Sequence, residues 1–277
     1  MARNSFTLLD GRAVLSVTGE DRAGFLQGLV SNDTAKLAPG RAVYAALLTA
    51  QGRYLHDFIM TAAEDAIWLD CEAARLADLQ RRLAIYKLRA KVALAARPDL
   101  AVAAIWGPDP PEIGVADPRL AALGRRLVAP RDGLAATLVA AGLEPADFAA
   151  YDRHRLALGI PDGSRDLPVE KALLLENGFD ELNGVDWHKG CYIGQELTAR
   201  TKYRGLVKKR LFPVRIEGAA PEPGTVLSLD GREAGEMRSS RDGMGLALLR
   251  LDMVEALTRP NPTRLVAWTP QWMRLPE

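Results

Sequence analysis

Residues 188–196 read HKGCYIGQE, and the polar run TARTKYRG follows at residues 198–205. The nine residues bring together a thiol, an ammonium, an imidazole, an amide and a carboxylate, with two glycines that allow the chain to bend. A thiol is a nucleophile or a metal ligand only as a thiolate, which nearby cations and the first amides of a helix favour. Lys189 and His188 supply cations, and residues 193–203 are expected to form the helix.

Cys191 has two interpretations. A lone cysteine is most often a shielded structural thiol that packs like a small apolar residue. The flanks of Cys191 are polar, which favours a reactive thiol instead. A Cys-His pair with His188 is weakly supported, because neighbouring positions in sequence do not establish such a pair. We therefore expect Cys191 to be the reactive residue of this chain.

The same stretch resembles the signature of the YgfZ-type folate-binding proteins, which are relatives of the glycine-cleavage T-protein, an aminomethyltransferase. The resemblance covers nearly the whole chain and is weakest over residues 98–150. Its wording is closest to the mitochondrial branch, which matures 4Fe–4S proteins. The other matching segments are FLQGLVSND at 25–33, LTAQGR at 48–53 with Asp57, GIP at 159–161, ELTART at 196–201 and KRLFPV at 209–214.

The resemblance implies a fold and a function. The fold is α+β and T-protein-like, with two α+β domains around a central cavity and a small C-terminal β-barrel. The function is that of a folate-binding accessory protein in the assembly or repair of iron–sulfur clusters, especially in 4Fe–4S proteins. Tetrahydrofolate is the expected cofactor, bound non-covalently, and iron–sulfur carrier or client proteins are the expected partners. Whether the protein also catalyses a reaction stays open, and an accessory role is favoured.

The composition is that of an ordinary globular protein, with 277 residues, 48% of them apolar and 26% charged. This length suggests two or three domains. The net charge of +1 creates no global field that would attract nucleic acid or a membrane. The longest apolar run, residues 42–50, is shorter than the roughly 20 residues of a membrane span. No presequence is visible, so we expect a cytoplasmic protein without a membrane partner.

The chain has two cysteines, Cys71 and Cys191, and three histidines. This excludes a disulfide framework and a cluster held by four cysteines of one chain. A cysteine-rich zinc site would need paired spacings, which are also missing. We therefore expect no stably bound metal, and any contact with an iron–sulfur cluster must be transient or shared with a partner.

Hydrophobic periodicity divides the chain into four segments. Residues 1–97 read as strand, helix, three strands, helix and strand, close to a split βαβ unit with an additional strand. Part of residues 159–209, a loop segment that carries the signature, is expected to complete this first domain. Residues 98–158 predict a second α+β domain. Residues 210–277 contain short strands with Gly and Pro turns, which predict a β-barrel or a sandwich.

A folate pocket needs a carboxylate or an amide for the pterin N–H groups, an apolar wall and a cation near the carboxylate tail. Asp57 shares a strand face with Leu55, so it is buried and paired, lines a cavity, or is an edge-strand charge. Glu176 follows three leucines, and either faces the ligand, as the resemblance implies, or ends a helix. The candidate cofactor-binding residues are Asp57, Glu176, Lys189, Gln195 and Arg200.

Six cations without an intervening acid form a basic run, and they are Arg200, Lys202, Arg204, Lys208, Lys209 and Arg210. Such a run could contact RNA, the polyglutamate tail of folate or an acidic partner, or be a solvated helix end. RNA binding or tRNA modification is the weakest of these functions, because only Tyr203 is available to stack on bases. The enzymatic rival is a tetrahydrofolate-dependent aminomethyl or one-carbon transferase. The T-protein works through a carboxylate, whereas the signature here centres on a thiol.

Overall fold

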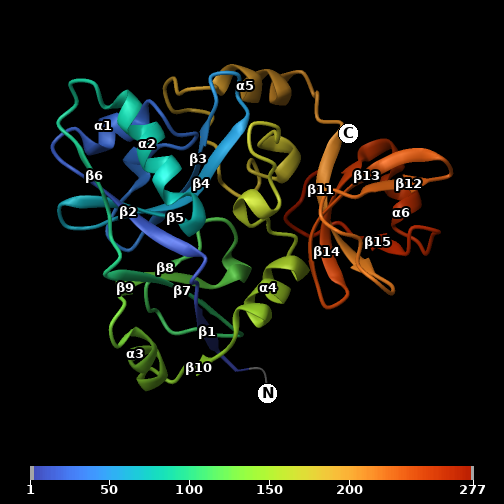
Figure 1. Cartoon of the computed structure of the whole chain (residues 1–277), viewed down its shortest axis with the longest axis horizontal. Helices are drawn as coiled ribbons and strands as arrows, with labels where there is room; N and C mark the ends of the chain where they lie inside the picture. The colour runs from blue at the N-terminus through green and yellow to red at the C-terminus, as the bar shows by residue number, and fades with distance from the viewer. Residues whose placement is uncertain (1–2, 276–277) are drawn as a thin grey trace. The chain divides into compact units, whose positions relative to one another are not determined.

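The computed structural model describes residues 3–275, and the chain divides into two compact units (Figure 1). Each unit combines segments that are distant in sequence. Unit 1 consists of Met1–Leu48, Leu55–Tyr151 and Asn183–Ile193. Unit 2 consists of Thr49–Tyr54, Asp152–Leu182 and Gly194–Glu277. The signature stretch passes from unit 1 into unit 2 at Gly194. The domain boundaries expected from the sequence stay predictions.

Unit 1 is built on two five-stranded sheets. The strands are β1 (Ser5–Leu8), β2 (Arg12–Thr18), β3 (Ala42–Leu48), β4 (Tyr54–Ala62), β5 (Ala66–Glu72), β6 (Ala93–Ala96), β7 (Leu100–Trp106), β8 (Val115–Ala116), β9 (Arg125–Pro130) and β10 (Glu144–Pro145). One sheet has the order β3-β4-β5-β2-β6 and the other the order β10-β1-β7-β9-β8. The helices are α1 (Arg22–Gln27), α2 (Leu76–Lys87) and α3 (Leu134–Ala140), with short 3-10 turns at Thr34–Lys36, Ala73–Arg75 and Ala121–Leu123.

Strand β7 separates two hydrophobic cores by the alternation of its side chains. Its even-numbered residues from 100 to 104 pack with Val14 of β2, and Trp68 of β5 lies against them, so this face joins the two sheets. Its odd-numbered residues from 101 to 105 pack with Leu134 and Leu138 of α3. The second sheet is thus buried on both faces along β7, which explains why this strand is apolar almost throughout.

The element order predicted for residues 1–97 is confirmed, as β2, α1, β3, β4, β5, α2 and β6 follow one another. Strand β1 was not predicted. It lies antiparallel to β7 and parallel to β10, and so belongs to the other sheet. Its partners lie about a hundred residues further along the chain, and local periodicity carries no signal for such a pairing.

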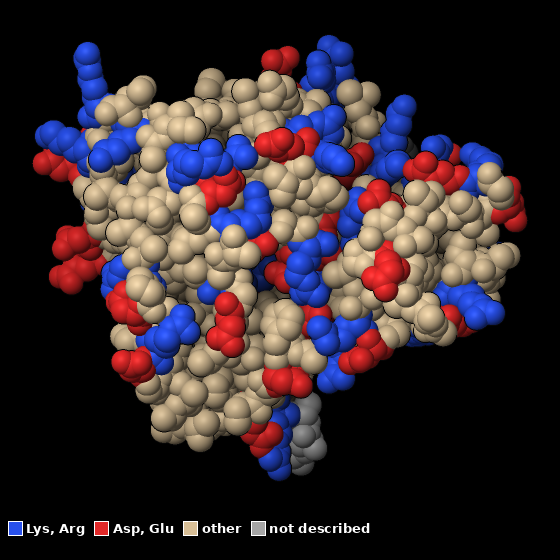
Figure 2. Space-filling model, in the orientation of Figure 1, with Lys and Arg blue, Asp and Glu red and all other residues tan. Residues whose placement is uncertain are grey.

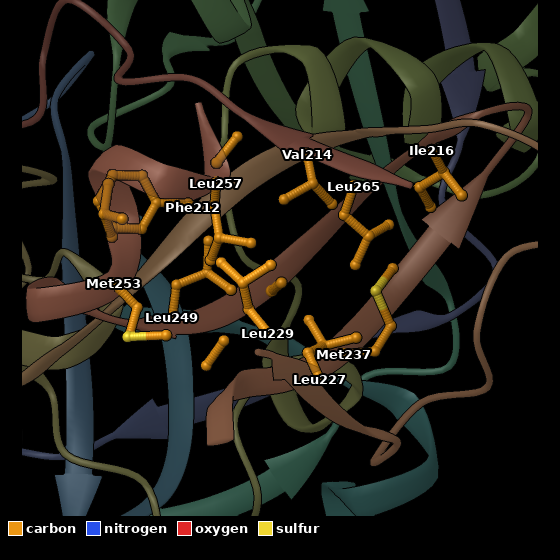
Figure 3. Close-up of a cluster of buried hydrophobic side chains, with 14 of the residues drawn as sticks. Phe212, Val214, Ile216, Leu227, Leu229, Met237, Leu249, Met253, Leu257 and Leu265 are labelled. Atoms are coloured by element: carbon orange, nitrogen blue, oxygen red, sulfur yellow. The ribbon is translucent and has the colours of Figure 1, made fainter. Parts of the chain in front are cut away.

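Unit 2 contains one antiparallel sheet of order β12-β13-β14-β11-β15. Its strands are β11 (Lys209–Ile216), β12 (Val226–Leu229), β13 (Arg232–Arg241), β14 (Met244–Arg250) and β15 (Leu265–Ala267). The helices that reach into or lie within this unit are α4 (Phe148–Ala157), α5 (Gln195–Tyr203) and α6 (Val254–Leu257), with 3-10 turns η4 (Gly163–Arg165), η5 (Leu175–Asn177) and η6 (Leu251–Met253). Figure 3 shows Phe212, Val214, Leu249 and Leu257 among the side chains that fill its core.

Strand β13 was not predicted, because its sequence REAGEMRSSR is mostly polar. A buried polar network explains its place in the sheet. The guanidinium of Arg155, on α4, lies 2.7 Å from Asp152, 2.6 Å from Asp166 and 2.7 Å from the Ser239 hydroxyl of β13. Burial raises the pKa of Asp152, but Arg165 and Arg155 hold it below its ordinary value, so the network is charged at neutral pH.

None of the helices within residues 3–275 combines the length and the apolar character that crossing a membrane requires.

Arg155→Met should strongly destabilise unit 2. The substitution leaves the buried carboxylates of Asp152 and Asp166 without this cation, and breaking a buried ion pair typically costs about 3–5 kcal/mol. Arg153→Met is the matched control on the same helix, because Arg153 pairs with Asp242 at the surface, where a pair contributes about 0–1 kcal/mol. Urea unfolding of the full chain measures both. Equal unfolding free energies for the two variants would contradict a structural role of the network.

Candidate functional site

Lys189 holds the loop that carries Cys191 against the end of α1 and the residues that follow this helix. Its ammonium donates to the backbone carbonyls of Gln27 at 2.8 Å, Val30 at 2.6 Å and Asn32 at 2.9 Å. An ammonium has three N–H donors, and all three therefore meet an acceptor. The ammonium also lies 5.1 Å from the centre of the Tyr192 ring, within the range of a cation–π contact. The contacts of Lys189 are those of a loop anchor.

The charge of this anchor depends on its surroundings. Burial lowers the pKa of Lys189 to about 8, while the carboxylates of Asp33 and Asp186 raise it. The ammonium therefore prevails at neutral pH. Asp186 in turn accepts the backbone amides of His188 at 2.6 Å and Lys189 at 2.8 Å. It also pairs with Lys36 at 2.6 Å, so the turn that precedes Cys191 is held from both sides.

Ser31 and Asn32 connect the same segment to the loop that leads into the signature. The Asn32 amide donates to the carbonyls of Tyr44 at 2.7 Å and Asn183 at 2.6 Å. The Ser31 hydroxyl donates to the carbonyl of Gly184 at 2.5 Å. Both side chains are buried, so these bonds are shielded from water. Residues 31 and 32 therefore connect β3 to the loop that precedes the signature.

The two cysteines lie in opposite environments. Cys191 is exposed, whereas Cys71 is 1% exposed inside β5. Burial raises the pKa of Cys71 to about 12, so this thiol stays protonated at neutral pH. Helix α5 begins at Gln195, after Gly194, and not at residue 193 as expected. Among residues 3–275, no group of three or more His, Cys, Asp or Glu side chains could hold a metal ion.

Asp57 is a buried carboxylate in the middle of β4. It is 5% exposed, and its Oδ2 accepts a hydrogen bond of 2.9 Å from the hydroxyl of Tyr44, on β3. Burial, followed by the charge of Asp57, raises the pKa of Tyr44 well above its ordinary value, so the phenol keeps its proton. Strand β4 lies between β3 and β5, so Asp57 is a buried, paired carboxylate and not an edge-strand charge, and its role toward a ligand stays a prediction.

A series of buried charged side chains continues from Tyr44. The Arg119 guanidinium is 5.8 Å from the centre of the Tyr44 ring and pairs with Asp117 at 2.7 Å. Arg126, on β9, lies 3.9 Å from Asp117 and 3.2 Å from Asp70, on β5. It therefore connects the two sheets of unit 1. Arg119, Asp117 and Arg126 were not predicted as functional residues, because residues 98–150 contain no recognisable motif. Asp117 and Arg119 have one local signal, an acid and a base two positions apart.

Glu176, Gln195 and Arg200 lie in unit 2. Burial raises the pKa of Glu176, on η5, and the positive charges of Lys209, Arg53 and Arg238 oppose this shift. Gln195 begins α5 and is half-buried, whereas Arg200, further along the same helix, is exposed. Helix α5 packs against η5, so unit 2 brings the elements that carry these three residues together.

Asp57, Lys189 and Cys191 lie in unit 1. Within this unit Lys189 and Asp57 are linked through two residues. Lys189 donates to the backbone of Asn32, the Asn32 side chain donates to the backbone of Tyr44, and the Tyr44 hydroxyl donates to Asp57. The predicted site residues are thus distributed over both units, and their roles toward a ligand stay predictions.

Half of the basic run is committed to ion pairs within unit 2, namely Lys202 with Asp180, Lys209 with Glu233 and Arg210 with Glu181. The last of these pairs is largely buried. On the face that Figure 2 shows, acidic side chains lie among the basic ones. The run is therefore partly structural and does not form a uniform cationic surface.

Two protein families match parts of this chain. The GCVT N-terminal domain matches residues 1–113, and the CAF17 C-terminal beta-barrel domain matches residues 208–275. The crystal structure of glycine cleavage system aminomethyltransferase T from Bartonella henselae superimposes with a TM-score of 0.71. It is 16% identical, and the match covers 90% of this chain and 79% of that one. At this identity the likeness shows the fold, and it confirms the predicted T-protein-like α+β fold with a C-terminal β-barrel.

Relatives that match over most of this chain are more similar to it in sequence than the Bartonella henselae protein. The mitochondrial iron-sulfur cluster assembly factor IBA57 of Mus musculus is 38% identical, and that of Homo sapiens is 37% identical. Each match covers 95% of this chain and 84% of the relative. The homologue of Neurospora crassa is 34% identical, over 82% of this chain and 59% of the relative. These matches support the mitochondrial branch of the predicted resemblance and leave its YgfZ-type branch unconfirmed.

The compartment given in the names of these relatives corrects the prediction of the cellular location. The expected cytoplasmic location is wrong, because these relatives are mitochondrial proteins. That expectation depended on the first residues of the chain, and they do not decide the compartment. The fold, the family domains and the identity over nearly the whole length agree with one another, and the chain belongs to the IBA57 family of iron–sulfur cluster assembly factors.

Proposed function

We propose that this chain assists the assembly or repair of iron–sulfur clusters in 4Fe–4S client proteins, with Cys191 as its reactive thiol and tetrahydrofolate as a non-covalent cofactor. The observation that carries the proposal is an exposed cysteine on a loop that Lys189 anchors at three points. An anchored loop holds a thiol in one place, and exposure lets a partner protein reach it.

The cluster would be cargo and not a resident group. As a thiolate, Cys191 would contribute one ligand to a cluster iron, and the carrier or client protein would contribute the others. Cys71 is buried inside its sheet, so the chain offers a single accessible thiol. A cluster needs about four such ligands. Because this chain offers one, the other ligands would come from a partner, and the site would be shared and transient.

Each unit carries polar side chains whose chemistry suits a folate. In unit 1 the buried carboxylate of Asp57, oriented by Tyr44, is a strong acceptor for pterin N–H groups. In unit 2 Glu176 is a second carboxylate acceptor, Gln195 an amide and Arg200 an exposed cation for the carboxylate tail. When bound, tetrahydrofolate supplies a reduced pterin that can carry one-carbon units. Lys189 would act on such a site by holding the loop.

A tetrahydrofolate-dependent aminomethyl or one-carbon transferase is the second candidate function. The buried carboxylate of Asp57 favours it, because the T-protein also works through a carboxylate and shares this fold. The two functions depend on different side chains. A transferase would need Asp57 and tolerate the loss of the Cys191 thiol, whereas an assembly factor that uses the thiol would not.

Asp57→Asn should weaken the binding of tetrahydrofolate roughly 10- to 150-fold, since the loss of a charged hydrogen bond typically costs about 1.5–3 kcal/mol. The asparagine keeps the size of the side chain and removes its charge. Anaerobic titration calorimetry measures the affinity. Asp65→Asn, in the exposed turn between β4 and β5, is the control and should bind as tightly as the wild type. Equal affinities for all three proteins would remove Asp57 from the folate site.

Iodoacetamide at neutral pH should modify Cys191 before Cys71, because Cys71 is buried and its pKa of about 12 keeps it protonated. Timed labelling with peptide mass mapping measures the two rates. In a strain that lacks the gene, Cys71→Ala should restore the activities of 4Fe–4S enzymes and Cys191→Ser should not. Full restoration by Cys191→Ser would refute the thiol mechanism and leave the signature as a structural loop.

A further inference from the structure

The C-terminal end of α2 carries exposed apolar side chains within unit 1. Ile85 is 62% exposed, Tyr86 41% and Leu88 90%, and we refer to these three residues as the α2 patch. Single apolar side chains at a surface are ordinary. Three large ones within residues 85–88 concentrate exposed apolar surface at one end of the helix, which is typical of an interaction site.

The packing of α2 does not depend on Ile85 or Leu88, the outward-facing members of the α2 patch. Helix α2 packs through Leu79 and Leu83, which are buried. Asp78 fixes the same helix to the buried His56 of β4, 2.9 Å away. Ile85 lies two residues beyond Leu83, and at 3.6 residues per turn it points away from that buried stripe. The helix is therefore held firmly while its last turn offers apolar surface to solvent.

Leu88 is strained as well as exposed. Its backbone has φ 41° and ψ −109°, a conformation that suits glycine and disfavours residues with a side chain. A leucine here costs conformational energy and gains almost no burial in return. A glycine would relieve the strain and remove the exposed side chain. A strained residue whose side chain does nothing for the free chain points to a contact made with something else.

Cations surround the α2 patch. Lys87 and Arg89 flank Leu88 and are exposed, and Lys91 follows, where it pairs with Glu20. Arg81, one turn before Ile85, pairs with Asp78. Figure 2 shows blue Lys and Arg side chains at the surface over the part of the molecule where Figure 1 places α2. An apolar centre with a charged rim is the usual anatomy of a protein interface, and this rim is complementary to acidic groups.

We propose that the α2 patch is the docking site for a partner protein whose binding segment presents apolar side chains flanked by Asp or Glu. The partner class is an iron–sulfur carrier or client protein, because the chain belongs to a family of assembly factors, which must meet such proteins. The proposal rests on the assembly role and is independent of folate binding. In it, Leu88 inserts into the partner, and Lys87 and Arg89 pair with its acids.

The test begins with a photo-crosslinking residue, p-benzoylphenylalanine, in place of Leu88 in the full chain inside its host cells. Mass spectrometry should identify an iron–sulfur carrier or client protein among the cross-linked products. That protein is then purified and titrated against three variants by calorimetry. Leu88→Gly and Arg89→Glu should each weaken its binding roughly ten- to hundredfold, and added salt should weaken the wild-type complex. Val139→Ser, at an exposed site on α3, should bind like the wild type.

Stability separates docking from folding. Because glycine accepts the backbone of Leu88, Leu88→Gly should have an unchanged or higher Tm, and its tetrahydrofolate affinity and Cys191 labelling should match the wild type. Unchanged affinity of both variants for the partner would overturn the proposal. So would cross-links only to a second copy of this chain, or the absence of protein cross-links. Flotation with phosphatidylcholine and phosphatidylserine vesicles that Leu88→Gly abolishes would assign the α2 patch to a membrane surface instead.

Discussion

The ammonium of Lys189, with its three backbone carbonyls, is the interaction on which the arrangement of unit 1 depends. It joins the loop that carries Cys191 to the turn after α1. The same turn contains Asn32, whose side chain leads to Tyr44 and from there to Asp57. A thiol and a buried carboxylate are therefore positioned by one hydrogen-bonded scaffold, although about 130 residues separate them in sequence. Because burial lowers the pKa of Lys189 to about 8, this scaffold is intact at neutral pH and loses its proton at more alkaline pH.

Buried charges recur in both units, and each time they connect elements that an apolar core would join less specifically. Arg119, Asp117 and Arg126 lead from one sheet of unit 1 to the other. Arg155 joins α4 to β13 in unit 2. Such pairs add little net stability over apolar packing, but removing one partner leaves an uncompensated charge. We infer that they determine which elements meet, while the exposed loop and the exposed end of α2 stay available for partners.

Strongly periodic elements could be predicted from the sequence. The periodicity of residues 1–97 predicted the order of the strands and helices from β2 to β6, and the signature stretch identified the fold through its resemblance. Strand β13 could not be predicted, because its buried residues are polar and their partners lie on α4. Tyr44 and Arg119 were missed since neither has a motif. Lys189 was expected to bind a cofactor, and the loop around it gives no sign in sequence of the carbonyls that occupy its donors. The compartment could not be predicted from the first residues.

Hydrogen exchange of Lys189→Met tests the central claim most directly, because methionine keeps the length of the side chain and removes its donors. In the wild type the Asp186 amide donates to Ser31 and the Ile193 amide to Gly28, so both should exchange slowly. In Lys189→Met these two amides should exchange much faster, while the amides between β2 and β5 keep their protection. Lys36→Met, which removes only the more exposed partner of Asp186, should leave the Ile193 amide protected. Unchanged exchange of both amides in Lys189→Met would contradict the claim that this lysine holds the Cys191 loop.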